Sequence, residues 1–211
     1  MTMNPGRPSA DDFLRIGPRV RALPIIHGSG DFAIRVREEL LSRPYDCVAV
    51  PLPPSFQDDV EAAIERLPAI SVVVRRDVEG GDGDDDESGF SYVPIDPCQG
   101  VIAALRVALG ERMARAFIDM ETPRFEAHSA SFPDPYALKR VSPEGFAAAI
   151  LPAIPPPWAG QHARRIAWMA DQLHRLERRY RQILLVCSLL DWPWIREAYG
   201  RRPEVDEPDP F

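Results

Sequence analysis

The sequence of 211 residues has little lysine, little cysteine and no long hydrophobic segment. Lys139 is the only lysine among 25 basic residues. The three cysteines form no Cys-x-x-Cys pair, which gives redox or haem chemistry little support. No run approaches the roughly 20 apolar residues of a membrane span, and the N-terminus lacks the apolar core of a signal peptide. We therefore expect a cytoplasmic protein with free thiols and no membrane partner.

A basic surface is also missing. The formal net charge is −7, and residues 77–89, with seven acids and no base, account for all of it. Binding to nucleic acid requires many positive charges that neutralise phosphates. The composition therefore excludes a nucleic-acid partner and predicts an acidic, mobile loop at residues 77–89.

Apolar runs of strand length alternate along the chain with segments of helical periodicity. The predicted strands are residues 19–26, 45–52, 70–74, 90–95, 115–121 and 183–188. The predicted helices begin near residues 31, 55, 97, 142, 161 and 191. This alternation predicts an α/β fold, a three-layer sandwich with helices on both faces of a mostly parallel or mixed sheet. Pro24 in the first strand indicates a sheet edge, a bulge or an irregular start.

The same pattern suggests one domain. We expect a single α/β domain at residues 18–200, between a disordered segment at 1–17 and a polar tail at 201–211. Residues 122–141 are mixed in composition and contain His128, so we interpret them as a lid or specificity segment. The helix at 161–181 carries an apolar stripe, and we expect His162 and His174 to lie on its solvated face.

His27 is the first candidate for a functional residue. It follows the first strand in the turn His27-Gly-Ser-Gly-Asp31 and comes directly before a helix. In open α/β sheets, ligands bind outside the carboxyl ends of strands, where helix N-termini offer unpaired N–H groups. We therefore expect His27 to act in catalysis and Ser29 to contact a substrate.

Other polar residues follow later strands. Asp119 and Glu121 are predicted on the same side of the fifth strand, and Asp191 follows the sixth. Arg164 and Arg165, which begin the long helix, could clamp an anionic substrate. Whether these groups converge on His27 depends on strand order. Each could instead be structural: His27 by hydrogen-bonding across its turn, Asp119 by closing a loop with backbone N–H groups, and Asp191 by capping the last helix. A Ser-His-Asp triad lacks its Gly-x-Ser-x-Gly turn.

Several short motifs resemble one known group of proteins. The motifs are Ile26-His-Gly-Ser-Gly30, Arg43-Pro-Tyr-Asp-Cys-Val48, Tyr92-Val-Pro94, Phe117-Ile-Asp119 and Arg165-x3-Met169-Ala. Together they are similar to the erythromycin-esterase-like, TraB and TIKI superfamily of α/β proteins, and most similar to an uncharacterised bacterial branch. The resemblance covers most of the chain and implies the same α/β fold.

The resemblance also implies a site. In the superfamily a His after the first strand, a Glu closing the second and a Gly-x-x-His after the last line a site linked to metal-dependent hydrolysis. His27 matches the first position. The second strand ends Val50-Pro-Leu52 without the Glu, and Ser188-Leu-Leu-Asp191 has Asp where His is expected.

Two hypotheses follow. The first is a divergent or degenerate hydrolase that binds a small molecule, with His27, Asp119 and Asp191 as catalytic residues. These three and Glu121 would hold a divalent ion such as Mg²⁺, Mn²⁺ or Zn²⁺. The second is a catalytically inert scaffold that binds a protein partner. The first predicts that His27, Asp119 and Asp191 share one site, whereas the second predicts scattered residues and an exposed apolar patch.

Overall fold

The computed structural model describes residues 10–77, 89–127, 130–157 and 159–205. A parallel sheet has the strand order β1-β6-β2-β5. These strands are β1 (Val20–Ile25), β6 (Ile183–Ser188), β2 (Cys47–Val50) and β5 (Ala114–Phe117). Because β1 is an edge strand, Pro24 is tolerated there without an N–H group. Among the described residues, no helix is long and apolar enough to cross a membrane.

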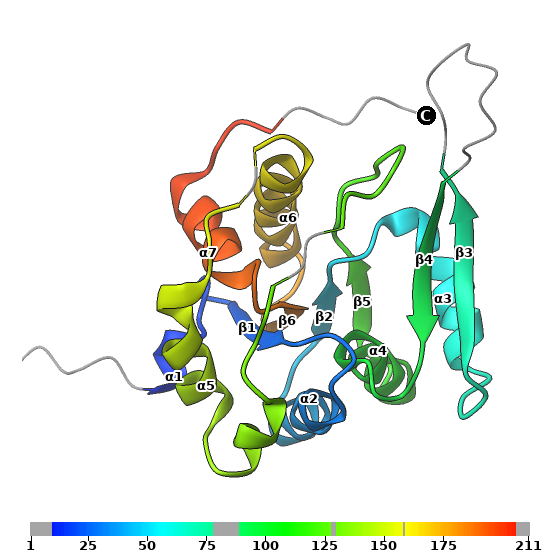
Figure 1. Cartoon of the computed structure of the whole chain (residues 1–211), viewed down its shortest axis with the longest axis horizontal. Coiled ribbons are helices and arrows are strands. Elements are labelled where there is room, and N and C mark those ends of the chain that lie inside the picture. Colours follow the sequence, from blue (N-terminus) through cyan, green and yellow to red (C-terminus); the bar gives the residue numbers. More distant parts are fainter. Residues whose placement is uncertain (1–9, 78–88, 128–129, 158, 206–211) are drawn as a thin grey trace, which may run out of the picture.

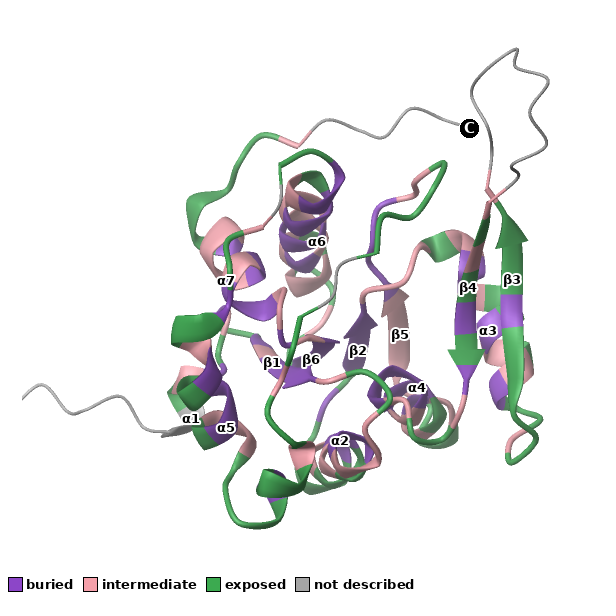
Figure 2. Ribbon diagram, in the orientation of Figure 1, coloured by how far each residue is buried: buried purple, intermediate pink, exposed green. Residues whose placement is uncertain are grey.

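Helices cover both faces of this sheet. Helices α2 (Gly30–Ser42) and α4 (Gly100–Gly110) lie on one face, and α6 (Gln161–Glu177) and α7 (Trp192–Arg201) on the other (Figure 1). The two central strands, β2 and β6, are therefore apolar and buried over almost their whole length (Figure 2). The predicted three-layer α/β fold is confirmed.

The third and fourth predicted strands form a separate two-stranded sheet. Strands β3 (Ser71–Arg76) and β4 (Phe90–Ile95) pair as an antiparallel hairpin beyond the β5 edge (Figure 1). Helix α3 (Gln57–Ile64), preceded by the 3-10 helix η1 (Pro54–Phe56), contacts both strands. The predicted acidic loop between β3 and β4 lies mostly outside the described residues.

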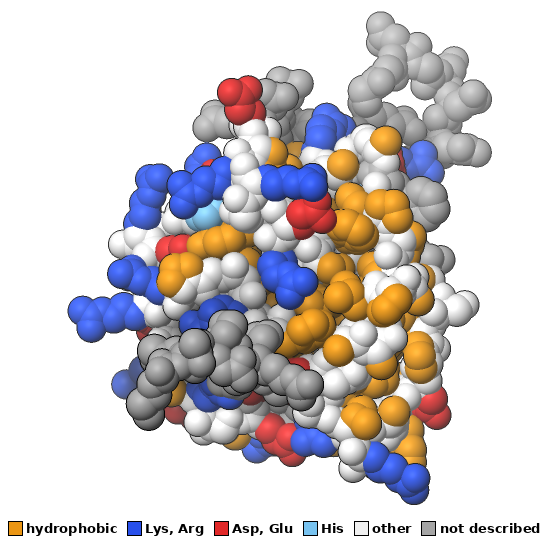
Figure 3. Space-filling model, turned by 90° about the vertical axis from the view of Figure 1, so that its left-hand side faces the viewer, with side chains coloured by type: hydrophobic (Ala, Val, Ile, Leu, Met, Phe, Trp, Pro, Cys, Tyr) orange, Lys and Arg blue, Asp and Glu red, His pale blue; other side chains and the backbone are white. Residues whose placement is uncertain are grey.

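The segment between β5 and α6 runs past the β1 edge. It contains the 3-10 helices η2 (Pro135–Lys139) and η3 (Leu151–Ala153) and helix α5 (Pro143–Ile150). Ser142 caps α5 by accepting a hydrogen bond from the Gly145 amide at 3.2 Å, as its sequence pattern indicates. Hydrophobic side chains gather on one half of the molecular face that carries α5 (Figure 3).

The described part of the N-terminal segment is packed against the domain. Helix α1 (Ala10–Phe13) is followed by Leu14, which is completely buried. The Phe13 ring meets Trp192 edge-on at 5.4 Å between centroids. The predicted disorder of residues 1–17 is therefore wrong for residues 10–17, because their apolar side chains complete the core beside α7.

Gly17 provides a test of this packing. A Cβ atom there would lie 2.4 Å from Oη of Tyr199, whose hydroxyl is held by Glu177. Gly17→Ala should therefore lower the free energy of unfolding by about 1–3 kcal/mol. Gly200→Ala is the matched control: its Cβ meets nothing within 4 Å, and alanine should stabilise helix α7 by about 0.5–1 kcal/mol. Denaturant unfolding measures both, and equal effects would contradict the packing of the N-terminal segment.

Candidate functional site

The buried polar residues of the described chain gather in one place. Each exposes less than a tenth of its surface, and all lie where β5 and β6 end or where α6 begins: Asp119, Gln161, His162 and Arg165. Because a buried polar group is costly unless it is paired, such a concentration reflects specific interactions.

Asp119 and Arg165 form a buried ion pair. Nε of Arg165 donates to Oδ1 of Asp119 at 3.0 Å, and Nη2 donates to Oδ2 at 2.5 Å. The Met120 amide donates to the same carboxylate at 2.8 Å. The Phe125 ring lies over the guanidinium at 4.6 Å. Arg165 is therefore committed to Asp119, contrary to the expectation that it clamps a substrate.

His162 and Asp191 form the second pair. Nε2 of His162 lies 2.9 Å from Oδ1 of Asp191, and the histidine is 5% exposed. Asp191 stands at the first turn of α7, but no backbone amide bonds to its carboxylate as a helix cap. The capping interpretation of Asp191 is wrong, because its carboxylate faces α6.

The geometry of α6 explains how the two pairs come together. His162 and Arg165 are three residues apart, so they lie on the same side of the helix, one turn from each other. Asp191 follows β6 and Asp119 follows β5, and these strands lie on either side of β2. The first turns of α6 therefore bridge two strand ends across β2, which ends in an apolar segment.

His27 lies at the neighbouring strand end. Because β1 pairs with β6, the turn after β1 adjoins Asp191, whose charge acts on the His27 ring. Gly28 adopts the left-handed conformation at φ 76°, and its amide donates to Oε1 of Gln99 at 2.9 Å. This turn presents His27 as an exposed residue at the start of α2.

Asp191 is the electrostatic centre of the group. Desolvation lowers the pKa of His27 even though the residue reaches solvent, and the Asp191 carboxylate opposes that lowering. Burial raises the pKa of Asp119, against the opposing effect of Arg165. Burial alone would lower the pKa of Arg165, but the negative charge of Asp119 and, after it, of Asp191 raises it.

Glu121 lies elsewhere. Its carboxylate accepts hydrogen bonds from the amide and the hydroxyl of Ser55, each at 2.8 Å. The prediction that Glu121 and Asp119 share one face of a strand is wrong, because β5 ends at Phe117 and the chain then leaves the sheet. Glu121 instead ties the loop after β5 to the loop after β2.

The remaining predicted residues have other roles or positions. Ser29 is the N-cap of α2, and its Oγ accepts a hydrogen bond from the Phe32 amide at 3.5 Å. Arg164 is exposed, and the structure records no ion pair for its guanidinium within the described ranges. His128 lies outside the described residues.

The donor set does not fit the predicted metal site. Arg165 and Met120 occupy the oxygens of Asp119, Ser55 occupies those of Glu121, and His162 holds one oxygen of Asp191. In the described ranges no three His, Cys, Asp or Glu side chains could hold an ion together. We therefore assign no chemical step to a metal.

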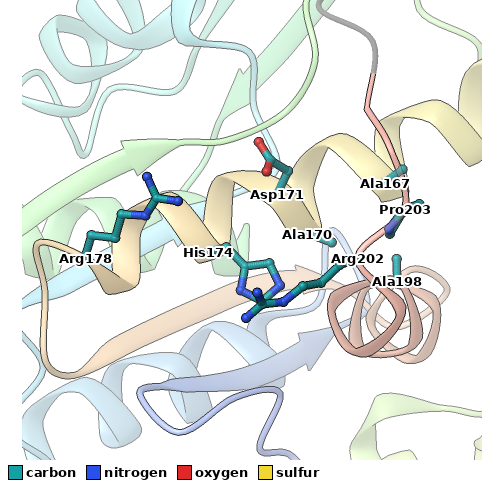
Figure 4. Close-up of a pocket in the computed structure, with 8 residues that line it drawn as sticks. All are labelled: Ala167, Ala170, Asp171, His174, Arg178, Ala198, Arg202 and Pro203. Carbon is teal, nitrogen blue, oxygen red and sulfur yellow. The ribbon is translucent and has the colours of Figure 1, made fainter.

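Two small cavities lie outside this group. One, of about 120 Å³, lies between α6 and α7, where Arg202 and Arg178 line it with His174 (Figure 4). The other, of about 130 Å³, is apolar and is lined by Phe132, Ile154 and Leu190 among others. Neither is lined by His27, Asp119 or Asp191.

The helical pattern of the sequence does indicate that His162 is buried. The stripe of Ile166, Met169 and Leu173, extended back by one turn, places His162 on the buried side of α6. His174 also departs from the prediction: its ring stacks on Tyr199 at 3.8 Å between centroids. His162 is therefore buried, whereas His174 is half-buried and lines the cavity between α6 and α7.

Comparison with known proteins adds no relative to this picture. No protein-family model, no curated protein and no solved structure gave a significant match to the chain. The geometry of the site must therefore carry the functional argument.

Removing Arg165 should be far more damaging than removing its neighbour. Arg165→Met leaves the Asp119 carboxylate buried without its partner and should cost about 3–5 kcal/mol of stability. Arg164→Met, the matched control at an exposed position, should change stability by less than about 0.5 kcal/mol. Urea unfolding of both variants measures the difference. Similar losses in the two would show that the ion pair is not essential to the fold.

The titration of His27 should report the charge of Asp191. Because this carboxylate raises the pKa of His27, Asp191→Asn should shift the titration of the ring to lower pH. NMR of the histidine ring protons measures it. An unchanged His27 titration would show that the charge of Asp191 does not act on the ring of His27.

Proposed function

We propose that the residues around Asp191 form the active site of a small-molecule hydrolase, a divergent member of the erythromycin-esterase-like, TraB and TIKI superfamily. One observation carries the proposal: all the buried polar side chains of the described chain meet at the carboxyl end of the sheet, beside an exposed histidine. In open α/β sheets this is the end at which ligands bind.

A histidine from another part of the chain lies close to the position where the superfamily pattern expects one. The resemblance expects a His after the last strand, where this chain has Asp191. His162, contributed by α6, lies 2.9 Å from that carboxylate. An imidazole is therefore present at this strand end, although it comes from a different part of the chain.

The proposed roles follow from exposure and pairing. His27 reaches solvent, so its neutral imidazole can take a proton from an attacking water. Asp191 stabilises the imidazolium that forms, and His162 holds Asp191 in position. The amides of Gly30 and Asp31, which begin α2 next to His27, can donate to the developing oxyanion, since they have no acceptor within the helix. The next amide, that of Phe32, already donates to Ser29.

The ion pair of Asp119 and Arg165 fixes the position of His162. Asp119 and Arg165 join the end of β5 to the first turns of α6, which carry His162. Gln161 adds a second tie, because it donates to the Arg124 carbonyl at 2.7 Å and accepts from the Glu126 amide at 2.9 Å. Residues 124–126 are thereby held over the Arg165 side of the site.

The proposal predicts which histidine variant loses activity. His27→Gln should reduce hydrolysis of p-nitrophenyl esters or anilides by about 100-fold or more, because it removes the proposed base. His174→Gln is the control and should keep activity, because His174 has no part in the proposed site and its ring pairs with the Tyr199 carbonyl. The rate of the unmodified protein should rise with pH through the His27 pKa, since the neutral ring is the active form.

The same measurements test a metal requirement and the alternative. If chelators abolish the activity and Mg²⁺, Mn²⁺ or Zn²⁺ restores it, the predicted metal site would be supported after all, with a further ligand such as His128. No hydrolysis of any ester, amide or phosphoester would favour the inert scaffold instead. The exposed apolar surface of the β3-β4 hairpin is the observation that supports that second candidate.

A further inference from the structure

The outer face of the β3-β4 hairpin is apolar and exposed. Side chains alternate between the two faces of a strand, so residues 72, 74 and 76 share one face with residues 90, 92 and 94 of the paired strand. Five of these six are apolar, and all six are exposed: Val72, Val74, Arg76, Phe90, Tyr92 and Pro94. We call this set the hairpin face.

This concentration is not a general property of the surface. Large hydrophobic side chains that the structure shows as exposed include Val72 at 53%, Val74 at 51%, Phe90 at 57% and Tyr92 at 68%. Ile70, just before β3, is 71% exposed. On the opposite face of the hairpin the apolar residues Val73 and Val93 are each only 9% exposed, and this face contacts α3.

We propose that the hairpin face is covered by the same face of a second copy of this chain. Aromatic side chains alone bury about 150–250 Å² each. The five exposed side chains, Ile70 included, therefore offer on the order of 500 Å² per copy. Two copies would bury about 1,000 Å², which reaches the lower limit of a specific interface.

The charges favour a second copy over other partners. The hairpin face carries one charged residue, Arg76, whereas membranes and nucleic acids are bound by clusters of basic residues. Residues 77–89, between the two strands, are mainly acidic in composition and contain one large apolar residue, Val78. They therefore lack the side chains that would cover the face.

The face is also complementary to itself. The cross-strand pairs run in the order Val72 with Pro94, Val74 with Tyr92, and Arg76 with Phe90. A two-fold axis near Val74 and Tyr92 places apolar residues at the centre and Arg76 at the rim, where a charge stays hydrated. The two hairpins would then stack like the layers of a β-sandwich. This inference is independent of the proposed hydrolase site.

Sedimentation and light scattering over a wide concentration range test the proposal. The unmodified protein should form dimers, and Val74→Glu or Tyr92→Ser should raise the dimer dissociation constant by about 30-fold or more. Leu41→Glu is the matched control, because Leu41 on α2 is 56% exposed but far from the hairpin in the fold, and it should leave the dimer intact.

A mixing experiment separates a lost interface from a damaged fold. Val74→Glu and Val74→Arg should each be monomeric, and their equimolar mixture should form heterodimers because opposite charges then meet across the axis. Circular dichroism verifies that both are folded. A monomeric unmodified protein, dimers that survive both hairpin variants, or folded Glu and Arg variants that do not associate would each overturn the proposal.

Discussion

The buried ion pair of Asp119 and Arg165 is the interaction on which the site depends. Taking two charges out of water is costly, and the pair is tolerated because Nε and Nη2 of Arg165 and the Met120 amide donate to the two carboxylate oxygens. In return the pair fixes the rotation and position of α6 relative to the sheet. His162, one turn away on the same side, then reaches Asp191 without further adjustment.

The polar residues of the site fall into two groups, buried residues that position others and an exposed residue that can meet a ligand. Asp119, Arg165 and His162 are buried and paired with other side chains, so they position other groups rather than meet a ligand. His27 is exposed and is influenced by Asp191, which makes it the residue able to exchange protons with a bound molecule. The hydrolase proposal therefore rests on His27, on the charge of Asp191 that acts on it, and on His162, which pairs with Asp191. It assigns no step to a metal.

The second surface lies at the other edge of the molecule. The β3-β4 hairpin continues beyond β5, whereas His27 and Asp191 follow the paired strands β1 and β6 (Figure 1). A dimer through the hairpin face would thus leave the proposed site open to solvent. The two proposals describe different parts of one chain, a polar strand end and an apolar outer layer, and each has its own test.

The sequence by itself determined the α/β alternation, the buried strands β2 and β6, and the placement of His27 in a turn before a helix. These features depend on local periodicity and on residue conformation. For Pro24 the sequence left a sheet edge, a bulge and an irregular start open, and the strand order decided for the edge. Tertiary structure alone decided that β1 lies beside β6, that His162 meets Asp191, and that Glu121 turns to Ser55. It also decided that β3 and β4 leave the main sheet. Such partners are far apart along the chain, so only strand order and helix rotation bring them together.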